Sequence, residues 1–425
     1  MMNYEEVLRL IHFHRKFSAA PGLERITKVM EKLGNPQDKL RFVHVAGTNG
    51  KGTTCSYIAS VLKESGYKVG LYTSPYVVEF TERFRINGEN ITEEALIRNY
   101  LRVENACKEI NVELVEFEFI TALAFCYFIE ENCDVVVLEV GLGGRFDATN
   151  IIKNSLASVI VSISLDHTGV LGNSVREIAW EKAGIIKENG RVIIYPDIDP
   201  DAEKVIIAEA ESKNAAIIKG KKEGISFISE GLSGCGFIYK NEEYKIPFVG
   251  KHQVYNAVNA LETLNVIGDE LPLVTSESLK MGLRNTRIEG RMTVFDFSPL
   301  FIVDGGHNPG CAAALKGVIE KNLKDKKITA IMGMMADKDS KEYLRLVAPL
   351  FNTLICVKPE GVRGLDKNEL KNEASEYLKD IYTAENMLEA INKAKEITDK
   401  EGAVIICGSF FIAGEAIRIL ESEGK

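Results

Sequence analysis

The stretch HVAGTNGKGTT, residues 44–54, constrains the fold more than any other part of this 425-residue chain. The apolar, β-branched run 41–45 before it predicts a buried strand, and the apolar spacing within 52–65 predicts a helix. Glycines at a strand-to-helix turn can adopt backbone angles closed to other residues. Their N–H groups can converge on an anion, helped by the positive end of the following helix. We therefore predict a phosphate-binding turn rather than an ordinary glycine-rich turn.

The residues after the glycines indicate which phosphates the turn would bind. Lys51 supplies a full positive charge for the outer phosphates, and the hydroxyl of Thr53 or Thr54 is placed to bind a phosphate-bound Mg²⁺. The spacing differs from the common Gly-x4-Gly-Lys-Ser/Thr pattern, because the first gap is shorter and Gly52 separates the lysine from the hydroxyl. This difference argues against a common kinase or GTPase.

Length and composition limit the class of protein. A chain of 425 residues favours two domains, and its net charge of −9 argues against nonspecific nucleic-acid binding, so we expect no nucleic-acid partner. The eight cysteines form no C-x-x-C pair and lie mostly in apolar runs, which is typical of a reducing compartment. The first residues lack a signal-peptide pattern, and no apolar run is long enough to span a bilayer. We expect a cytoplasmic protein without a membrane partner.

From residue 41 onwards, apolar strands alternate with helical patterns, which predicts an α/β fold with a mostly parallel sheet covered on both faces. Two helices are expected within 3–33, broken at Ala20-Pro21-Gly22, and a short antiparallel flap within 215–248. The expected strands are 41–45, 68–72, 134–140, 157–163 and 191–195. The expected helices are 52–65, 94–110, 118–131, 174–186, 201–213, 254–267 and 276–284.

A second alternation near the carboxyl end predicts a smaller, Rossmann-like doubly wound domain. Its expected strands are 292–303, 328–333, 352–357 and 403–407, and its expected helices are 310–323, 339–349, 368–378 and 386–399. We place the join near 286–292, so that the domains are residues 1–290 and 291–425. Ligands in such sheets bind beyond the carboxyl ends of the strands. A cleft between the two domains is therefore the expected site.

Polar residues at strand ends are the candidates for metal binding. Glu139 ends an apolar strand and either caps the turn that follows or reaches a metal held by the phosphate-binding turn. His167, in Ser162-Ile-Ser-Leu-Asp-His-Thr168, is either a metal ligand or a hydrogen-bonded core histidine. Lys182 ends a helical pattern, where a solvated or paired surface lysine is the ordinary expectation.

Further candidates lie around the expected join. Asn256 and Asn259 share one helix face, where an amide pair either binds a nucleobase edge or cross-links helices. Asp304 and His307 follow another apolar strand and either face the cleft or belong to a turn rich in Gly, Asn and Pro. Gly333-Met-Met-Ala-Asp-Lys-Asp339 is a comparable strand end, and Arg287 and Arg291 could reach phosphates from the join. Together these features suit a reaction in which a phosphoryl group activates one component and another attacks it.

Eight of these motifs, taken in order, resemble the folylpolyglutamate synthase/dihydrofolate synthase family of the Mur ligase superfamily. The resemblance extends from about Gly22 to Asp337. The motifs are AGTNGKGTT, TSPYVVEFTERFRING, EVGLGGRFDATN, SLDHTGVLG, WEKAGIIK, KHQVYNAVNAL, RIEGR and VDGGHNP.

The resemblance implies the Mur ligase architecture and an ATP-dependent carboxylate–amine ligase. ATP would phosphorylate the carboxylate of a folate, or of dihydropteroate, and the amine of L-glutamate would attack the acyl phosphate. Phosphorylation replaces a repelling negative charge with a leaving group, and metals and cations then stabilise the phosphoryl oxygens. The implied cofactors are ATP and one or two Mg²⁺ ions, and we expect a monomer.

The family's functional positions carry over to matching residues of this sequence. Lys182 matches a lysine that is carbamylated in the family, and His307 would face the glutamate or phosphoryl site. Lys51, Lys182 and His307 are therefore the implied catalytic residues. The implied ATP-binding residues are Asn49, Gly50, Lys51, Gly52, Thr53, Asn256, Arg291 and Asp304. The implied metal ligands are Ser74, Glu139 and His167. The pterin-binding segments correspond to Phe117, Glu118, Phe146, Asp147 and Ala148.

Two departures and two alternative functions remain. Gly306 stands where the family has Ala, and Val115 precedes the Phe-Glu segment where some dihydropteroate users have a polar residue. One alternative is a Mur-type ligase that joins an amino acid to a UDP-linked muramoyl peptide, although such enzymes lack the equivalent of Gly52. The other is a non-catalytic ATP-gated binding protein, which would not need a metal site.

Overall fold

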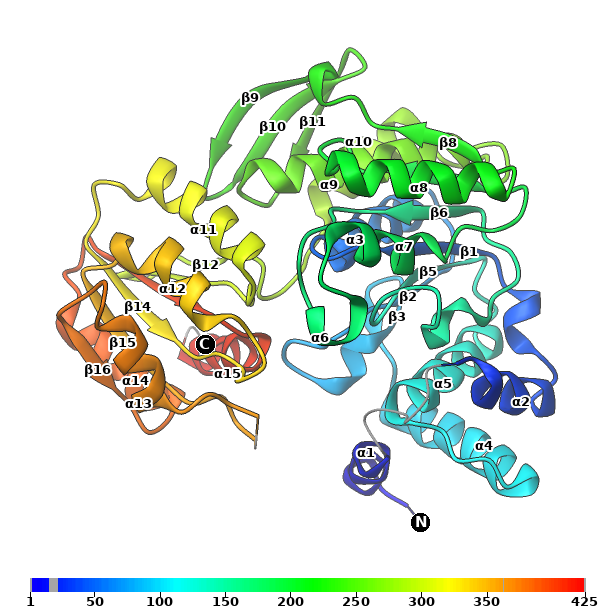
Figure 1. Ribbon diagram of the computed structural model, residues 1–425, viewed down its shortest axis with the longest axis horizontal. Coiled ribbons are helices and arrows are strands. Elements are labelled where there is room, and N and C mark those ends of the chain that lie inside the picture. Colours follow the sequence, from blue (N-terminus) through cyan, green and yellow to red (C-terminus); the bar gives the residue numbers. More distant parts are fainter. Residues whose placement is uncertain (1, 15–21, 362, 424–425) are drawn as a thin grey trace.

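The computed structural model describes residues 2–14, 22–361 and 363–423 (Figure 1). Two helices, α1 (Tyr4–Phe13) and α2 (Glu24–Lys32), lie on either side of the expected break, of which Ala20 and Pro21 fall outside the described residues. The first large sheet and the second form separate lobes in Figure 1, with three antiparallel strands above and between them. The predicted α/β architecture is therefore confirmed.

The first sheet has eight strands in the order β4-β3-β2-β5-β1-β6-β7-β8. From β2 to β8 along that order the strands pair parallel, whereas β3 pairs antiparallel with β2 and the edge strand β4 pairs antiparallel with β3. Their bounds are β1 (Phe42–Ala46), β2 (Val69–Tyr72), β3 (Phe84–Ile86), β4 (Glu89–Asn90), β5 (Val135–Glu139), β6 (Ala157–Ile160), β7 (Arg191–Ile194) and β8 (Ala216–Lys219).

Helices cover both faces of this sheet, as the near-continuous apolar strands predict. Along β5, Val135 and Val137 join one core with helices α3 and α7–α10, whereas Val136 and Leu138 join another with α1, α2, α4 and α5. The bounds are α3 (Lys51–Glu64), α4 (Glu93–Ile110), α5 (Glu116–Glu130), α6 (Thr168–Leu171), α7 (Val175–Ala183), α8 (Pro200–Ser212), α9 (Lys251–Val266) and α10 (Ser276–Asn285).

Strand β1 lies at the centre of the sheet, between β5 and β6. Chain connections leave this point in both directions, so the carboxyl ends of β1, β5 and β6 meet at a topological switch point where α/β sheets bind ligands. Val45 pairs with Glu139 across β1 and β5. The fold therefore places Glu139 beside the start of the glycine-rich turn.

The predicted flap is present as three antiparallel strands in the order β11-β10-β9. They are β9 (Ile225–Gly231), β10 (Gly234–Tyr239) and β11 (Glu242–Ile246). The first part of the expected flap behaves differently, because β8 pairs parallel with β7 and extends the large sheet.

The second sheet has six strands in the order β12-β13-β17-β14-β15-β16, and only the edge strand β12 is antiparallel. Its strands are β12 (Thr293–Phe295), β13 (Leu300–Val303), β14 (Ile328–Met332), β15 (Thr353–Cys356), β16 (Ile381–Thr383) and β17 (Ala403–Cys407). Its helices are α11 (Pro309–Asn322), α12 (Ser340–Val347), α13 (Lys367–Ala374), α14 (Met387–Ile397) and α15 (Phe410–Glu423).

One predicted strand, 292–303, is wrong: it is an antiparallel pair, β12 and β13. The chain turns at 296–299, where Phe297 N–H donates to the Phe295 carbonyl at 2.8 Å and Pro299 interrupts the strand, since proline has no N–H for a ladder. The short strands β3, β4 and β16 and the last helix α15 were not predicted.

The join predicted near 286–292 falls between α10 and β12. The division into residues 1–290 and 291–425 stays a prediction. Among the residues that the structure describes, no helix combines the length and the apolar character needed to cross a bilayer.

Candidate active site

The glycine-rich turn joins β1 to α3 as predicted. Gly50 has φ of 91°, a left-handed conformation suited to glycine, and directly precedes α3, whose first residue is Lys51. Thr48 N–H donates to the Ser162 carbonyl at 2.7 Å, which ties the turn to the end of β6. A Cβ on Gly52 would lie 3.5 Å from Glu139 Oε2. The turn therefore presents the start of a helix and a lysine toward a buried carboxylate.

Glu139 is 4% exposed, and one of its oxygens accepts the Ser74 N–H at 2.9 Å. Burial raises the pKa of this carboxyl, and the nearby charge of Lys51 opposes that effect. Burying a carboxylate with so few hydrogen bonds is costly unless a cation neutralises it. The position is therefore suited to a cation that arrives with a ligand.

A Mg²⁺ ion fits this donor set. Ser74, Glu139 and His167 all line one cavity of about 120 Å³ together with the glycine-rich turn. Within the described part of the chain, no three His, Cys, Asp or Glu side chains cluster tightly enough to hold a metal by themselves. Mg²⁺ commonly binds one or two carboxylates and completes its shell with water and substrate phosphates. Glu139 and the Ser74 hydroxyl would hold the ion, with His167 at the same cavity wall.

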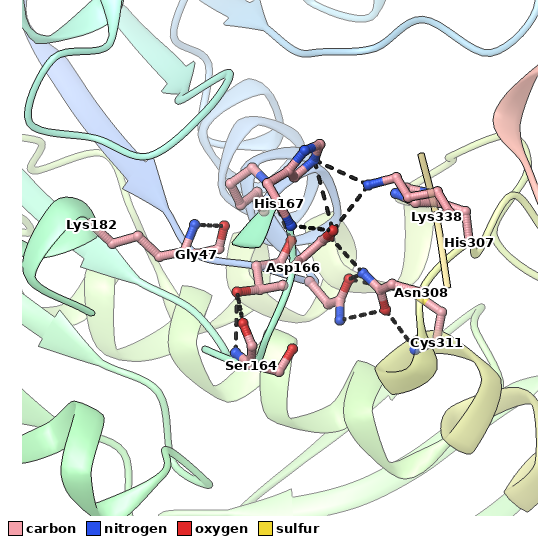
Figure 2. Close-up of polar contacts among 12 residues, drawn as sticks. Gly47, Ser164, Asp166, His167, Lys182, His307, Asn308, Cys311 and Lys338 are labelled. Carbon is pink, nitrogen blue, oxygen red and sulfur yellow. Dashed lines mark hydrogen bonds and ion pairs between the residues drawn. The ribbon is translucent and has the colours of Figure 1, made fainter. Parts of the chain in front are cut away.

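Lys182 lines this cavity too, so the expectation of a surface lysine is wrong. Lys182 is only 4% exposed, and its Nζ donates to the Gly47 carbonyl at 2.8 Å (Figure 2). Burial lowers the pKa of the amine to about 7, and the charge of Lys51 adds to the effect. A neutral lysine amine is thus readily accessible near neutral pH.

The second sheet contributes three predicted residues to the same region. Arg291 lines this cavity and a larger one, and its guanidinium lies 4.4 Å from the Phe410 ring centroid. His307 lines the smaller cavity, with Nδ1 3.2 Å from the Gly305 carbonyl. Burial lowers the His307 pKa to about 4, so the ring is neutral at pH 7 and leaves Nε2 as an acceptor. Asp304 accepts the N–H groups of Gly306 and Met292 at 2.8 and 3.1 Å.

Polar contacts that sequence reasoning missed join the two lobes across this cavity (Figure 2). Asn308 Nδ2 donates to Asp166 Oδ2 and to Asn49 Oδ1, both at 2.9 Å. Lys338 Nζ donates to Asp166 Oδ1 at 2.9 Å and lies 3.2 Å from His167 Nε2. His167 is not a core histidine, because 39% of its side chain is exposed. The signals available were the strand-end positions of these residues.

A larger cavity of about 660 Å³ adjoins the other side of the glycine-rich turn and is lined by Asn49, Gly50, Thr53, Asn256, Arg291 and Asp304, among others. The Asn256 Oδ1 atom is buried without a hydrogen-bond partner, and a Cβ on Gly50 would lie 2.4 Å from it. Asn259 does not line this cavity; its Nδ2 donates to the Ile160 carbonyl at 3.3 Å and cross-links α9 to β6. The two amides therefore differ: Asn256 can bind a ligand, whereas Asn259 is structural.

The five predicted pterin-binding residues lie outside both cavity linings. Phe117 packs against Gly141 of the smaller cavity, where a Cβ would lie 2.3 Å from its ring. Glu118 is occupied by a bidentate contact with Arg25, at 2.7 and 3.1 Å.

The other three flank the end of β5. Asp147 is buried, accepts N–H groups of Leu142 and Thr149 at 2.9 and 3.0 Å, and organises that loop. Phe146 is 47% exposed and Ala148 is buried.

The loop that carries Ser74 also contacts the second lobe. Arg418 of α15 donates to the Val78 carbonyl at 2.7 Å. A Cβ on Gly414, one turn earlier in the same helix, would lie 1.8 Å from the Val77 carbonyl oxygen. Only glycine at 414 allows α15 and this loop to approach so closely.

Comparisons with known proteins agree with this geometry. Residues 45–264 match the Mur ligase middle domain, and residues 290–410 match the Mur ligase, glutamate ligase domain. The chain is 34% identical over 441 residues to folylpolyglutamate synthase of Lacticaseibacillus casei, covering 100% of both chains. It is 37% identical over 356 residues to dihydrofolate synthase/folylpolyglutamate synthase of Bacillus subtilis, covering 80% of this chain and 82% of the relative.

Solved structures give the same answer. E. coli FolC in complex with DHPP and ADP superposes with a TM-score of 0.89 at 30% identity, covering 100% of this chain and 99% of that one. A bifunctional folylpolyglutamate synthase/dihydrofolate synthase with Mn, AMPPNP and L-glutamate bound gives 0.86 at 30% identity, covering 99% and 98%. Because the similarity spans the whole chain and both domain matches occur in order, the chain belongs to the folylpolyglutamate synthase/dihydrofolate synthase family of the Mur ligase superfamily.

Proposed function

We propose that this chain is an ATP-dependent ligase that joins L-glutamate to the carboxylate of a folate through an acyl phosphate. One observation carries the proposal. A single cavity gathers Lys51, Glu139 and His167 from the first sheet with Arg291 and His307 from the second. A phosphoryl donor bound on one side would thus meet an acceptor facing residues of both sheets.

The first half-reaction transfers the terminal phosphoryl group. A carboxylate oxygen of the folate attacks the γ-phosphorus, the bond to the β–γ bridging oxygen breaks, and ADP leaves. Lys51, the N–H groups of the glycine-rich turn and Arg291 would hold the phosphate oxygens and neutralise their charge. Bound Mg²⁺, held by Ser74 and Glu139 with His167, would supply further charge neutralisation.

The second half-reaction forms the amide. The deprotonated amine of L-glutamate attacks the acyl carbon, and the tetrahedral adduct expels inorganic phosphate. His307 faces the cavity as a neutral ring, so its free Nε2 can accept a hydrogen bond from the attacking amine without repelling it. Asn256 and Asp304 would bind the nucleoside part of ATP in the larger cavity, where the unpartnered Asn256 Oδ1 can accept a base amino group.

Lys182 is proposed to be carbamylated. A carbamate forms when the neutral amine attacks CO₂ and loses a proton, and burial lowers the Lys182 pKa enough to supply that amine. The product is an anion beside the glycine-rich turn, able to bind a second Mg²⁺. Incubation with ¹³C-bicarbonate should give a carbamate carbon signal that is absent from Lys182→Met.

The pterin-binding role of Phe117, Glu118, Phe146, Asp147 and Ala148 stays a proposal. The exposure of Phe146 and the contact of Phe117 with Gly141 support an aromatic surface beside the cavity. The ion pair of Glu118 and the loop contacts of Asp147 favour supporting roles for these two carboxylates. A second activity on dihydropteroate is proposed because relatives that carry both names match most of the chain.

The central test is phosphate release from ATP with L-glutamate and either tetrahydrofolate or dihydropteroate. Release that needs all three components is expected with tetrahydrofolate, and release with dihydropteroate would establish the second activity. ATP binding without release would favour the non-catalytic binding protein. Thermal stabilisation by UDP-muramoyl peptides alone, and not by folates, would favour the Mur-type alternative.

Lys51→Ala tests the phosphate site directly. Removing the lysine is expected to lower the rate of phosphate release by about 10³-fold, since it deletes a charge aimed at the transferring group. Unchanged turnover would show that the glycine-rich turn does not bind the reacting phosphates.

The cytoplasmic location and the monomeric state stay predictions, and light scattering of the purified chain would measure the oligomeric state.

A further inference from the structure

Lys338 comes from the second sheet and contacts two residues of the first. It lies between β14 and α12, and only 10% of its side chain is exposed. Nζ donates to Asp166 Oδ1 at 2.9 Å and contacts His167 Nε2 at 3.2 Å (Figure 2). Asn308 occupies the other oxygen of Asp166. These contacts join the two lobes at one side of the cleft.

The contact with His167 affects metal binding. An ammonium carries donors only, so His167 Nε2 must be the acceptor and its lone pair is occupied. A divalent cation at the same nitrogen would meet both a blocked lone pair and a positive charge at close range. Lys338 and a metal on this atom therefore exclude each other.

Lys338 is the partner that can move. His167 has φ of 50°, uncommon for a residue with a side chain, and its N–H donates to Asp166 Oδ1 at 2.8 Å. That backbone is fixed by the turn before α6, whereas four methylene groups let the Lys338 ammonium swing. Loss of the His167 contact would leave Lys338 at the edge of the cavity, with Asp166 as its remaining partner.

We propose that Lys338 and the metal bind His167 in alternation. Without metal, Lys338 joins the two lobes through Asp166 and His167. When the metal takes His167, Lys338 is released to neutralise the phosphoryl oxygens of the reacting substrate. The second role rests on the proposed ligase function, whereas the competition for His167 does not.

Mn²⁺ binding to the nucleotide-free protein, followed by electron paramagnetic resonance of free Mn²⁺, tests the competition. Lys338→Met is expected to tighten Mn²⁺ binding by about tenfold, because the competing cation is gone. Lys341→Met is the matched control, since Lys341 is exposed in the first turn of α12 and its loss changes the net charge equally. In a His167→Ala background, Lys338→Met should change Mn²⁺ affinity no further.

Turnover tests the second role. Lys338→Met is expected to lower kcat by about 10- to 100-fold with a small change in KM for ATP, and Lys338→Arg should restore part of kcat.

Equal Mn²⁺ affinity in wild type and Lys338→Met would overturn the competition for His167, and unchanged kcat would overturn the catalytic role of Lys338. If Lys338→Met does not fold, as thermal unfolding would reveal, Lys338→Gln gives the same comparison. Absence of phosphate release from the wild type would refute only the ligase function, because the Mn²⁺ result is independent of it.

Discussion

Two lysines from different lobes differ in their surroundings: Lys182 lines the smaller cavity, whereas Lys338 contacts Asp166 and His167 in its wall. Lys182, from α7, is buried with one backbone carbonyl as its hydrogen-bond acceptor, and its pKa falls to about 7. Lys338, from the second lobe, is paired directly with the Asp166 carboxylate at 2.9 Å. Burial without a close carboxylate favours a neutral amine, whereas a direct ion pair favours the cation.

The difference shows how one residue type can serve two steps. A neutral amine can react covalently, and Lys182 is therefore suited to modification. A paired ammonium cannot react but can exchange one anionic partner for another, and Lys338 is suited to that. Burial alone would raise the pKa of the Asp166 carboxyl, but the positive charge of Lys338 above all holds that pKa well below its usual range. The two lysines thus differ in their acceptors: a backbone carbonyl of its own lobe for Lys182, and a carboxylate of the other lobe for Lys338.

The largest expected effect tests whether position or lowered pKa gives Lys182 its importance. Lys182→Met should lower kcat for phosphate release by about 10³-fold, because the cavity loses the group that can become a metal-binding anion. Lys187 is a matched control: its pKa is also lowered to about 7 by burial, but it donates to Asn150 Oδ1 and the Ile152 carbonyl away from the cavity. Lys187→Met should change kcat only a few-fold once folded protein is compared. An equal loss of kcat in both variants would mean that the enzyme needs a buried lysine amine but not one at the position of Lys182 in the cavity.

The same variant should gain stability while losing activity. The folded-state pKa of Lys182, about 7, lies below its ordinary value of 10.5, so between these values the unfolded chain binds more protons. Wild-type stability from this group therefore rises with pH from about 7 to 10.5, by at most about 1.4 kcal/mol per pH unit. Lys182→Met should lack this rise and be more stable at pH 7 in bicarbonate-free buffer. Denaturant unfolding at several pH values measures how the free energy of unfolding of wild type and of Lys182→Met changes with pH. The same pH dependence in both proteins would contradict a neutral Lys182 amine in the folded state.

The sequence contained most of the first lobe's site because its signals are local. The glycine-rich turn, Glu139 and His167 each follow an apolar strand within a few residues, and parallel strands bring their carboxyl ends together. The contacts of Lys338 with Asp166 could not be predicted in this way. They join residues 172 positions apart, through a domain arrangement that no local spacing encodes.

Two errors have different causes. Lys182 has the sequence environment of an ordinary helix end, and only the packing of α7 against the glycine-rich turn buries it. The segment 292–303 has apolar runs on both sides of Asp296-Phe-Ser-Pro299, and reading it as one strand overlooked that turn signal, which the strand pairing confirms. Local patterns therefore identified most elements, whereas the burial of Lys182 required the fold.

A smaller effect is expected from widening the distance between the lobes. Gly414→Ala would place a Cβ 1.8 Å from the Val77 carbonyl oxygen, so α15 and the loop carrying Ser74 must separate. We expect about a tenfold loss of kcat and weaker Mn²⁺ binding, because overpacking of this kind costs roughly 1–3 kcal/mol. Gly268→Ala is the control, since the nearest atoms to its Cβ would lie 3.4 and 3.6 Å away. If Gly414→Ala binds Mn²⁺ like wild type, Ser74 does not depend on the second lobe for its position.

The smallest effect is expected from a second lysine that joins the lobes, at the rim of the larger cavity. Lys321 of α11 contacts Glu230 of the flap at 2.5 Å, but 57% of its side chain is exposed. Exposed pairs contribute at most about 1 kcal/mol, so Lys321→Met should change KM for ATP less than about fivefold and leave kcat unaltered. Raising the salt concentration should reduce the small difference in KM for ATP between wild type and variant. A loss of kcat comparable with that of Lys338→Met would mean that any bond between the lobes suffices, and that Lys338 has no special place beside His167.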